Sequence, residues 1–332
     1  MSTDRSDLAR MHTSCVCAPG KAMIVGEYAV LDGSPAVVAA IDCFAEATLR
    51  PSAVPNASPF LVAAQVQTRQ ALQARGIDPA MAHIDWLPHV DTSSFSRDGR
   101  KLGLGSSAAA TVAAVGSWYV AAGLDVDSDA VRHEIAAVAR DAHDAAQGVR
   151  GSGSDILAAA WGGLRVVGAA STSAMPEHLR LPNGLRLCLI ATTESASTAQ
   201  LVARYRQAGD ATRPARDLLF QAAVEFISAC RGDHAEVALQ SIHQALQGYM
   251  QLGSAMGCAL ATEEHQTIAA VVRSLGGAAK PSGAGGGDLA VALVPDDTAA
   301  QRLIQCLPSH LSVLPLALSE RGLRASFNPH RA

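Results

Sequence analysis

Three glycine-rich stretches most constrain how this chain can fold, because each contains or adjoins one of its only three lysines. The lysines are Lys21 in Ala-Pro-Gly-Lys, Lys101 in Lys-Leu-Gly-Leu-Gly-Ser-Ser, and Lys280 in Lys-Pro-Ser-Gly-Ala-Gly-Gly-Gly-Asp. Glycine lets backbone N–H groups approach a phosphate closely, and lysine adds a compact positive charge. We therefore predict one polyphosphate site built from three distant parts of the chain. The alternative is coincidence in a chain that otherwise uses arginine.

The composition limits the class of protein. A length of 332 residues predicts about two domains. Hydrophobic residues make up 49% of the chain and aromatic residues 4%, so we expect cores packed from small aliphatic side chains. A net charge of −4 argues against a nucleic-acid partner, which selects a basic surface. An anionic substrate must then be held by local positive charge.

Several features predict a cytoplasmic protein. The seven cysteines are scattered and include no Cys-x-x-Cys pair, a pattern typical of a reducing compartment. Residues 1–10 lack the apolar core of a signal peptide, and no apolar run reaches the length of a membrane span. We expect neither nucleic acid nor membrane as a partner, and both monomer and homodimer stay open.

The expected elements alternate between strands and helices, with a polar boundary near the middle of the chain. Residues 1–13 are expected to be a disordered tail, and residues 168–182 to separate domains at 14–178 and 179–332. Pro19-Gly20 is expected to be a turn and residues 83–101 irregular. The expected strands are 36–41, 45–49, 164–167, 185–192, 289–294 and about 313–318. The expected helices are about 61–75, 106–122, 128–147, 156–160, 199–206, 214–231, 233–251, 263–274 and 297–306.

The stretch Gly103-Leu-Gly-Ser-Ser-Ala108 opens an alanine-rich, helix-like run. The free N–H groups and the positive dipole end of such a helix form an anion site. Ser106 and Ser107 can either cap the helix or contact phosphate and Mg²⁺. The lysine precedes the glycines, unlike in a Walker A loop, and Ala108 replaces the last glycine of a Rossmann fingerprint. A Ser-capped helix after a tight turn is the alternative.

A second motif, Gln-Gly-Val-Arg-Gly-Ser-Gly-Ser-Asp, places Asp155 after a glycine-rich turn and before a short helix. Asp141 and Asp144 lie at the end of the preceding helix, where the helix dipole disfavours negative charge. This suggests a compensating cation, either a metal or Lys21. Solvent or a nearby arginine would also compensate, and Asp155 or Ser154 can be a simple N-cap.

Two further motifs lie in the second half of the chain. The glycine-rich stretch 281–288 precedes a strand and can wrap a ligand with backbone N–H groups. Residues 193–198, Thr-Glu-Ser-Ala-Ser-Thr, lead from a strand into a helix, so hydroxyl and helix N–H groups converge there. A flexible hairpin connection and a set of N-cap residues are the respective alternatives.

Taken in order, these motifs resemble the three signature motifs of the GHMP kinases (galactose, homoserine, mevalonate and phosphomevalonate kinases). They are residues 18–21 with Gly26-Glu27-Tyr28, then residues 103–108, then residues 282–288. The resemblance covers about residues 15–294. It implies an α+β two-domain fold, with an N-terminal domain like domain 2 of ribosomal protein S5 and a ferredoxin-like C-terminal domain. ATP and Mg²⁺ would lie between the two domains.

Within the superfamily, the details look like the phosphomevalonate kinase family. Lys101 lies just before the glycines, and Ala142-His143 precedes Gln147-Gly148 and then Gly151-Ser152-Gly153-x-Asp155. The stretches 195–198 and 280–288 also match that family.

The resemblance implies a role for particular residues. It makes Lys21 and Asp155 catalytic, with Asp155 orienting the acceptor and pairing with Lys21. The implied ATP-binding residues are Lys101, Gly103, Leu104, Gly105, Ser106, Ser107 and Ala108. The implied substrate-binding residues are Lys101, Ser152, Ser195, Ser197, Thr198, Lys280, Ser282, Gly283 and Ala284. The implied metal ligands are Ser107 and Asp144, although an acid at the position of Asp144 is often missing from phosphomevalonate kinases.

The implied reaction is ATP-dependent phosphorylation of 5-phosphomevalonate to 5-diphosphomevalonate, in the mevalonate pathway of isoprenoid biosynthesis. The partner would be a small phosphorylated acceptor. Three alternatives stay open. They are mevalonate kinase or another small-molecule kinase of the superfamily, the ATP-dependent diphosphomevalonate decarboxylase, and a non-catalytic ligand sensor.

Overall fold

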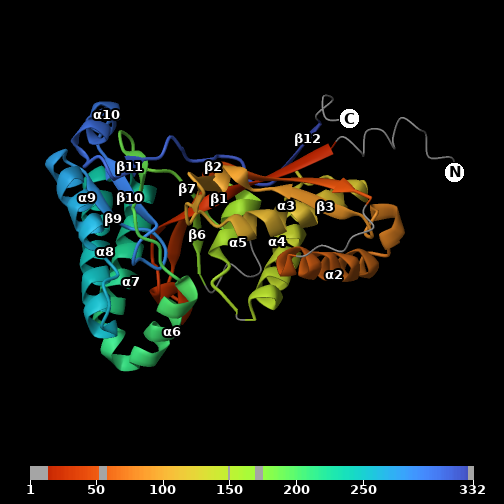
Figure 1. The fold of residues 1–332 in the computed structure, drawn as a ribbon, viewed down its shortest axis with the longest axis horizontal. Coiled ribbons are helices and arrows are strands. Elements are labelled where there is room, and N and C mark those ends of the chain that lie inside the picture. Colours follow the sequence, from red (N-terminus) through yellow and green to blue (C-terminus); the bar gives the residue numbers. More distant parts are fainter. Residues whose placement is uncertain (1–13, 52–57, 149, 169–174, 328–332) are drawn as a thin grey trace.

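The computed structural model describes residues 14–51, 58–148, 150–168 and 175–327. The expected N-terminal tail, residues 1–13, lies outside the described residues. The chain forms two lobes, with β1 running from one lobe toward the other (Figure 1).

The first domain is built on an antiparallel sheet with the strand order β12-β1-β2-β6-β7, and β3 also pairs with β2. Its strands are β1 (Ser14–Val25), β2 (Ala36–Arg50), β3 (Leu87–Asp91), β6 (Leu164–Val167), β7 (His178–Leu179) and β12 (Arg324–Phe327). The short 3₁₀ helices η1 (Ala29–Asp32), η2 (Pro79–Ala82) and η3 (Ser93–Phe95) lie in its connections. The hairpin β4 (Ser96–Arg97) and β5 (Arg100–Lys101) stands apart from the sheet.

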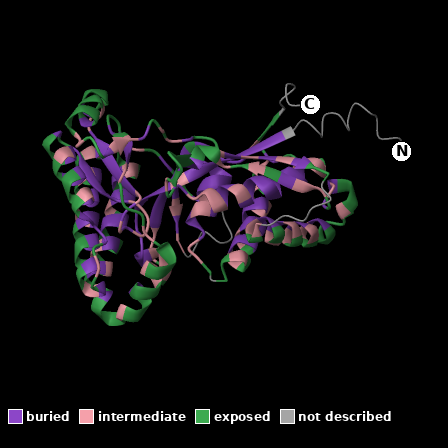
Figure 2. Ribbon diagram, viewed as in Figure 1, coloured by how far each residue is buried: buried purple, intermediate pink, exposed green. Residues whose placement is uncertain are grey.

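Helices cover one face of this sheet in two layers. The helices are α2 (Pro59–Ala74), α3 (Ser106–Ala121), α4 (Asp129–Gln147) and α5 (Ser154–Trp161). Helices α3 and α5 pack on β1 and β2, and α2 and α4 pack on α3. Small residues permit this close packing, since a Cβ on Gly116 would lie 3.0 Å from side-chain atoms of Val16 and Leu323. Figure 2 shows the buried residues filling the strands and the helix faces turned toward them.

The second domain has a four-stranded antiparallel sheet with the order β11-β8-β10-β9. Its strands are β8 (Arg186–Ala191), β9 (Ala278–Pro281), β10 (Leu289–Val294) and β11 (Ser312–Val313). Its helices are α6 (Thr198–Ala208), η5 (Gly209–Thr212), α7 (Arg213–Gly232), α8 (Ala235–Met256), α9 (Glu263–Ser274) and α10 (Asp297–Cys306). Helices α8 and α9 pack against the sheet, and α7 packs along α8 (Figure 1).

The structure corrects several expectations about the elements. Pro19-Gly20 is not a turn but a register shift inside β1, and the expected strands 36–41 and 45–49 form the single strand β2. A Cβ on Gly20 would lie 2.5 Å from the Cys43 sulfur, so the two strands cross closely there. The stretch 83–101, expected to be irregular, contains β3, η3 and the β4–β5 hairpin.

The C-terminal strand also links the two domains. The sequence reasoning did not foresee β12, which pairs with β1 and so adds residues 324–327 to the first sheet. The domain division between residues 178 and 179 stays a prediction. The strand β12 does not follow that division, because it lies after residue 179 but belongs to the sheet of the first domain. None of the helices in the described ranges is long and apolar enough to cross a bilayer.

Candidate active site

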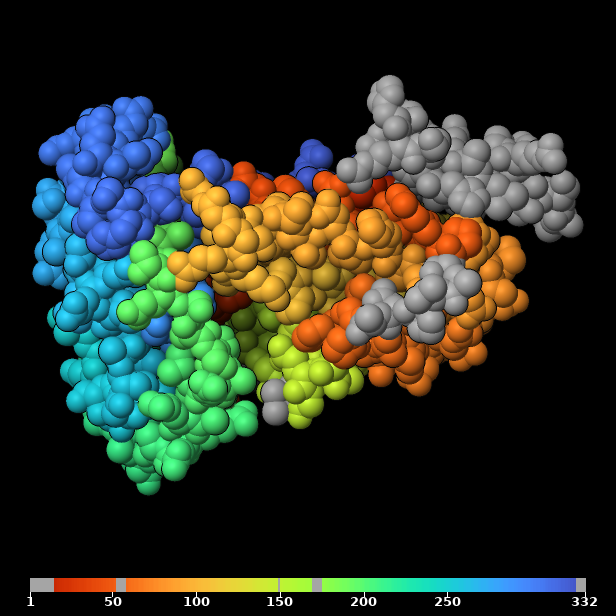
Figure 3. All heavy atoms as spheres, in the orientation of Figure 1, coloured from red at the N-terminus to blue at the C-terminus, as the bar shows by residue number. Residues whose placement is uncertain are grey.

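A cleft of about 540 Å³ lies between the two domains. Its walls come from β1, η1, the turn before α3 and the α4–α5 connection on one side, and from α6 and the loop after β9 on the other. Figure 3 shows the surface hollowed where α6 faces α4. The predicted site residues that line the cleft are Lys21, Gly103, Asp144, Ser152, Asp155, Thr198, Ser282, Gly283 and Ala284. Residues of every predicted motif therefore lie around one cavity.

The first glycine loop leads directly into α3. Gly103 and Gly105 have φ values of 69° and 76°, which glycine adopts without strain. Gly105 is the N-cap of α3 and no side chain caps this helix, so Ser106 and Ser107 do not have the capping role considered for them. The first N–H groups of α3 thus keep the capacity to bind an anion.

Lys21 and Asp155 approach this loop from two different elements. Lys21 lies on β1, where its N–H donates a 2.8 Å hydrogen bond to the carbonyl of Leu104. Asp155 lies in the first turn of α5. A Cβ built on Gly105 would lie 3.0 Å from Lys21 Cγ and 3.8 Å from Asp155 Cβ. Glycine therefore leaves room for the Lys21 side chain beside the loop. The implied Lys21–Asp155 ion pair is not among the contacts within 4.0 Å found for the described residues.

Ser107 meets a residue that the sequence reasoning did not select. Its Oγ lies 3.2 Å from His143 Nε2, and His143 is buried, lines the cleft and stacks on Phe60 with a ring separation of 5.0 Å. The imidazole therefore fixes the direction of the Ser107 hydroxyl. The available signal was a histidine directly before Asp144 on a helix that ends at the cleft.

The unfavourable acid at the end of α4 has protein partners. Asp144 Oδ1 accepts a 3.2 Å hydrogen bond from the Gly151 N–H, and Asp144 Oδ2 lies 4.0 Å from Arg140 Nε. The negative charge of Asp144 is thus compensated by an arginine, Arg140, which was one of the open alternatives. No cluster of three or more metal-ligating side chains occurs within the described part of the chain. Mg²⁺ that arrives with a nucleotide needs only one or two protein ligands, so Ser107 and Asp144 still fit that role.

The second glycine-rich loop, residues 281–288, closes the cleft from the second domain. Ser282 Oγ lies 3.0 Å from both the N–H and the carbonyl of Met23 on β1. Lys280 was predicted to bind substrate, and the structure places it away from the cavity. Its side chain is fully buried and forms an ion pair with Glu27, so it does not face the cleft.

Asp288 also lines the cleft and was not selected from the sequence. It has a φ of 61°, and a Cβ on Gly103 would lie 3.1 Å from its own Cβ. Burial raises the pKa of this carboxyl group. A hydrogen bond from the Ala196 N–H and the positive charges of Arg100 and Lys21 lower the pKa, but by less than burial raises it. Its position at the end of the glycine stretch was the signal that could have identified it.

The remaining predicted residues lie beside the cleft. Leu104 and Ala108 belong to the hydrophobic core, and Lys101 is exposed on the β4–β5 hairpin. Ser197 caps α6 by accepting from the Gln200 N–H, so the N-cap reading of that stretch holds for Ser197. Ser195 is exposed. None of these residues is among those lining the cavity.

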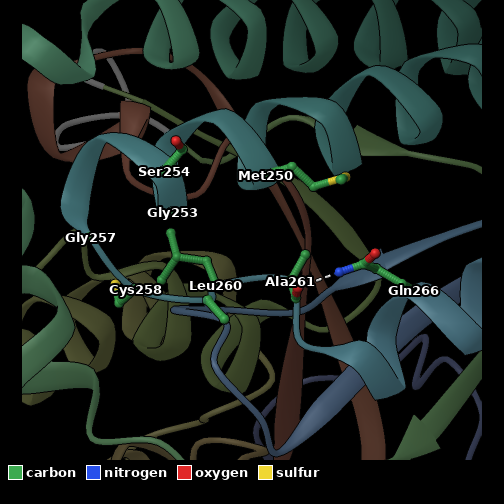
Figure 4. Close-up of a pocket in the computed structure, with 9 residues that line it drawn as sticks. Met250, Gly253, Ser254, Gly257, Cys258, Leu260, Ala261 and Gln266 are labelled. Carbon is green, nitrogen blue, oxygen red and sulfur yellow. Dashed lines mark hydrogen bonds between the residues drawn. The ribbon is translucent and has the colours of Figure 1, made fainter.

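A second, shallower groove of about 410 Å³ lies at the end of α8 (Figure 4). Its lining contains no charged side chain, unlike that of the cleft. One of its lining residues, Leu260, accepts a 2.7 Å hydrogen bond from the Gly286 N–H. The groove therefore lies behind the 281–288 loop, on the side away from the cleft.

Comparisons with known proteins agree with this geometry. The family model described as the GHMP kinases N terminal domain matches residues 81–163, and the GHMP kinases C terminal model matches residues 230–313. The chain is 31% identical to a phosphomevalonate kinase of Streptomyces sp. (strain CL190), over 91% of this chain and 96% of that protein. The chain therefore belongs to the GHMP kinases, and it is a phosphotransferase. Among them, it resembles phosphomevalonate kinases.

Solved structures show the same fold. The phosphomevalonate kinase of Streptococcus pneumoniae, in complex with phosphomevalonate and AMPPNP, superposes with a TM-score of 0.78 at 19% identity. That match covers 92% of this chain and 99% of the other. The mevalonate kinase of L. major in complex with R-mevalonate gives a TM-score of 0.64 at 18% identity, covering 92% and 96%. The predicted superfamily and its two-domain α+β fold are confirmed.

Proposed function

We propose that this protein transfers the γ-phosphoryl group of ATP to the phosphate of 5-phosphomevalonate, yielding 5-diphosphomevalonate and ADP. It would act in the cytoplasm, in the mevalonate pathway of isoprenoid biosynthesis. The observation that carries the proposal is the inter-domain cleft, which joins Lys21, Asp155 and two glycine-rich loops. The near full-length similarity to the Streptomyces phosphomevalonate kinase supports the choice of acceptor.

Phosphoryl transfer depends on positioning and charge neutralisation more than on covalent chemistry. The uncapped start of α3 would hold the ATP phosphates, and Lys21 on the facing strand would stabilise negative charge on the transferred group. Mg²⁺ would add positive charge between the phosphates, with Ser107 and Asp144 as its protein ligands. Asp155 would orient the acceptor.

Residues from both sides of the cleft would hold the acceptor phosphate. Thr198 and Arg206 of α6 line the cleft opposite Arg150. A helix start and two guanidinium groups suit a phosphate group, which mevalonate itself lacks. This set replaces Lys101 as the proposed phosphate contact, because Lys101 does not line the cleft.

Phosphorus NMR of the reaction products tests the proposal. Incubation with Mg-ATP and 5-phosphomevalonate should produce ADP and a diphosphate ester in equal amounts, with no inorganic phosphate and no CO₂. Release of CO₂ and inorganic phosphate from 5-diphosphomevalonate would identify a decarboxylase instead. ATP binding without any product from either acceptor would identify a ligand sensor.

A further inference from the structure

A buried ion pair connects the two domains at the wall of the cleft, where Glu27 is one of the lining residues. Lys280, at the end of β9, is fully buried, and Glu27, just after β1, is 3% exposed. The Lys280 ammonium donates to Glu27 Oε1 and also to the carbonyl of Pro281, at 2.6 Å. Burial lowers the pKa of Lys280, and the charge of Glu27 opposes that shift.

This pair is a poor means of stabilising the protein. The free energy needed to remove two charges from water can exceed the attraction between them. Replacing a buried ion pair with an apolar pair of similar volume therefore often leaves a protein as stable or more stable. The other carboxylate oxygen, Glu27 Oε2, has no hydrogen-bond partner among the described side chains and backbone groups. A buried charge with one unsatisfied oxygen is expensive. The pair therefore calls for an explanation other than stability.

Lys280 and two tyrosines beside the ion pair hold the carbonyl groups of the glycine-rich loop. The Tyr249 hydroxyl donates to the carbonyl of Gly283, and the Tyr28 hydroxyl donates to that of Ala284 at 2.6 Å. Lys280 binds the Pro281 carbonyl. Three carbonyl groups within four residues thus point into the protein.

Unlike these carbonyl groups, only some N–H groups of the loop have hydrogen-bond partners. Gly286 N–H donates to Leu260, and Gly283 N–H makes a long contact of 3.4 Å with Glu27 Oε1. Among the described residues, no acceptor is found for the N–H groups of Ala284 and Gly285, and both residues line the cleft. Two free N–H groups beside the cleft are donors for an anionic oxygen.

We infer that Glu27 and Lys280 are positioning residues, which fix the 281–285 backbone so that the N–H groups of Ala284 and Gly285 face the phosphate groups in the cleft. Because Glu27 belongs to the first domain and Lys280 to the second, the pair also sets the distance between the loop and Lys21. A Cβ on Gly283 would lie 3.9 Å from Lys21 Nζ, so this distance is short. The predicted effect of the pair on catalysis rests on the proposed kinase function. Its predicted effect on the loop backbone does not.

A double variant separates positioning from stability. Lys280→Met alone leaves a buried carboxylate unpaired, and we expect its Tm to fall by about 5 °C or more. Combining it with Glu27→Leu removes both charges, so the Tm should return to within about 3 °C of the wild type. The kcat/KM of the double variant for the acceptor should still be ~10-fold to 100-fold below the wild type, because the loop is no longer aligned. A double variant with wild-type kcat/KM would overturn the inference.

A milder pair of variants covers the case in which the double variant does not fold. Tyr28→Phe removes only the hydroxyl that holds the Ala284 carbonyl, and Tyr119→Phe removes a buried hydroxyl that donates to Glu134, between α3 and α4. We expect kcat/KM to fall ~5-fold in Tyr28→Phe, the effect of one hydrogen bond, and to stay unchanged in Tyr119→Phe. Equal values in both variants would overturn the inference.

Hydrogen exchange gives a readout that does not need activity. In the Tyr28→Phe and double variants, backbone amides in peptides covering 281–289 should exchange at least ~5-fold faster than in the wild type, and those covering 106–121 should not change. If the wild type phosphorylates no acceptor, the proposed function is wrong, and this measurement alone decides the inference. Faster exchange confined to 281–289 supports it, and unchanged exchange overturns it.

Discussion

Replacing Gly105 with alanine tests whether the first glycine loop positions Lys21. Gly105 has a φ of 76°, a left-handed conformation that costs an L-residue about 1–2 kcal/mol. The added methyl group would lie 3.0 Å from Lys21 Cγ and 3.4 Å from Lys21 Cε. The 3.0 Å distance is shorter than an ordinary van der Waals contact, so the lysine side chain must move by a few tenths of an ångström.

Gly123 provides a matched control at the other end of the same helix. It also has a φ of 76°, but no atom lies within 4 Å of the Cβ that alanine would add. Gly123→Ala therefore carries the same backbone cost without a displaced neighbour. The difference between the two variants isolates the contact with Lys21.

Urea unfolding and steady-state kinetics measure the two effects. We expect both variants to lose about 1–2 kcal/mol of unfolding free energy. The kcat of Gly105→Ala should fall ~10-fold, because the added methyl group displaces Lys21, which is proposed to contact the transferred phosphoryl group. The kcat of Gly123→Ala should match the wild type. Equal kcat values in the two variants would refute the role given to the loop.

Three further variants test the site and its pH dependence. Asp155→Asn should reduce kcat with 5-phosphomevalonate by no more than ~10-fold, because the acceptor phosphate, with a second pKa of about 6, is already ionised; a loss beyond ~10³-fold would indicate a required base. Burial lowers the pKa of His265 to about 4, so its contribution is present above pH 6.5 and lost as the pH falls through 4. The wild type should thus lose about 3 kcal/mol more unfolding free energy between pH 7 and pH 4 than His265→Gln, by urea titration. Burial raises the pKa of Asp288, so the charged carboxylate destabilises the folded protein as the pH rises. Asp288→Asn should therefore raise the Tm at pH 7, and this gain should shrink toward pH 4. A gain in Tm that grows in acid would contradict this sign.

Local patterns identified most of the helices and the glycine loops. The helix expected at 106–122 is α3 (Ser106–Ala121), and the helix expected at 263–274 is α9 (Glu263–Ser274). The short strand β12 escaped because it is stabilised by pairing with β1, at the other end of the chain. Such pairing leaves no periodic signal within the segment itself.

The site was harder to predict where burial decides the role. Lys21 and Lys280 look alike in sequence, since each adjoins glycines, yet Lys21 lines the cleft and Lys280 is enclosed. The difference comes from Glu27, which is 253 positions from Lys280 and meets it only in the folded chain. His143 was quoted as part of a motif but given no role, because its partner Ser107 lies 36 positions away.

The most direct test of the whole account is ADP release in a coupled assay with Mg-ATP, comparing 5-phosphomevalonate with mevalonate as acceptor. We expect turnover with 5-phosphomevalonate and a kcat/KM for mevalonate lower by at least ~100-fold, because mevalonate has no phosphate for α6, Arg150 and Arg206 to hold. A preference for mevalonate would keep the fold and the ATP site but contradict the acceptor and the phosphate contacts proposed for α6, Arg150 and Arg206.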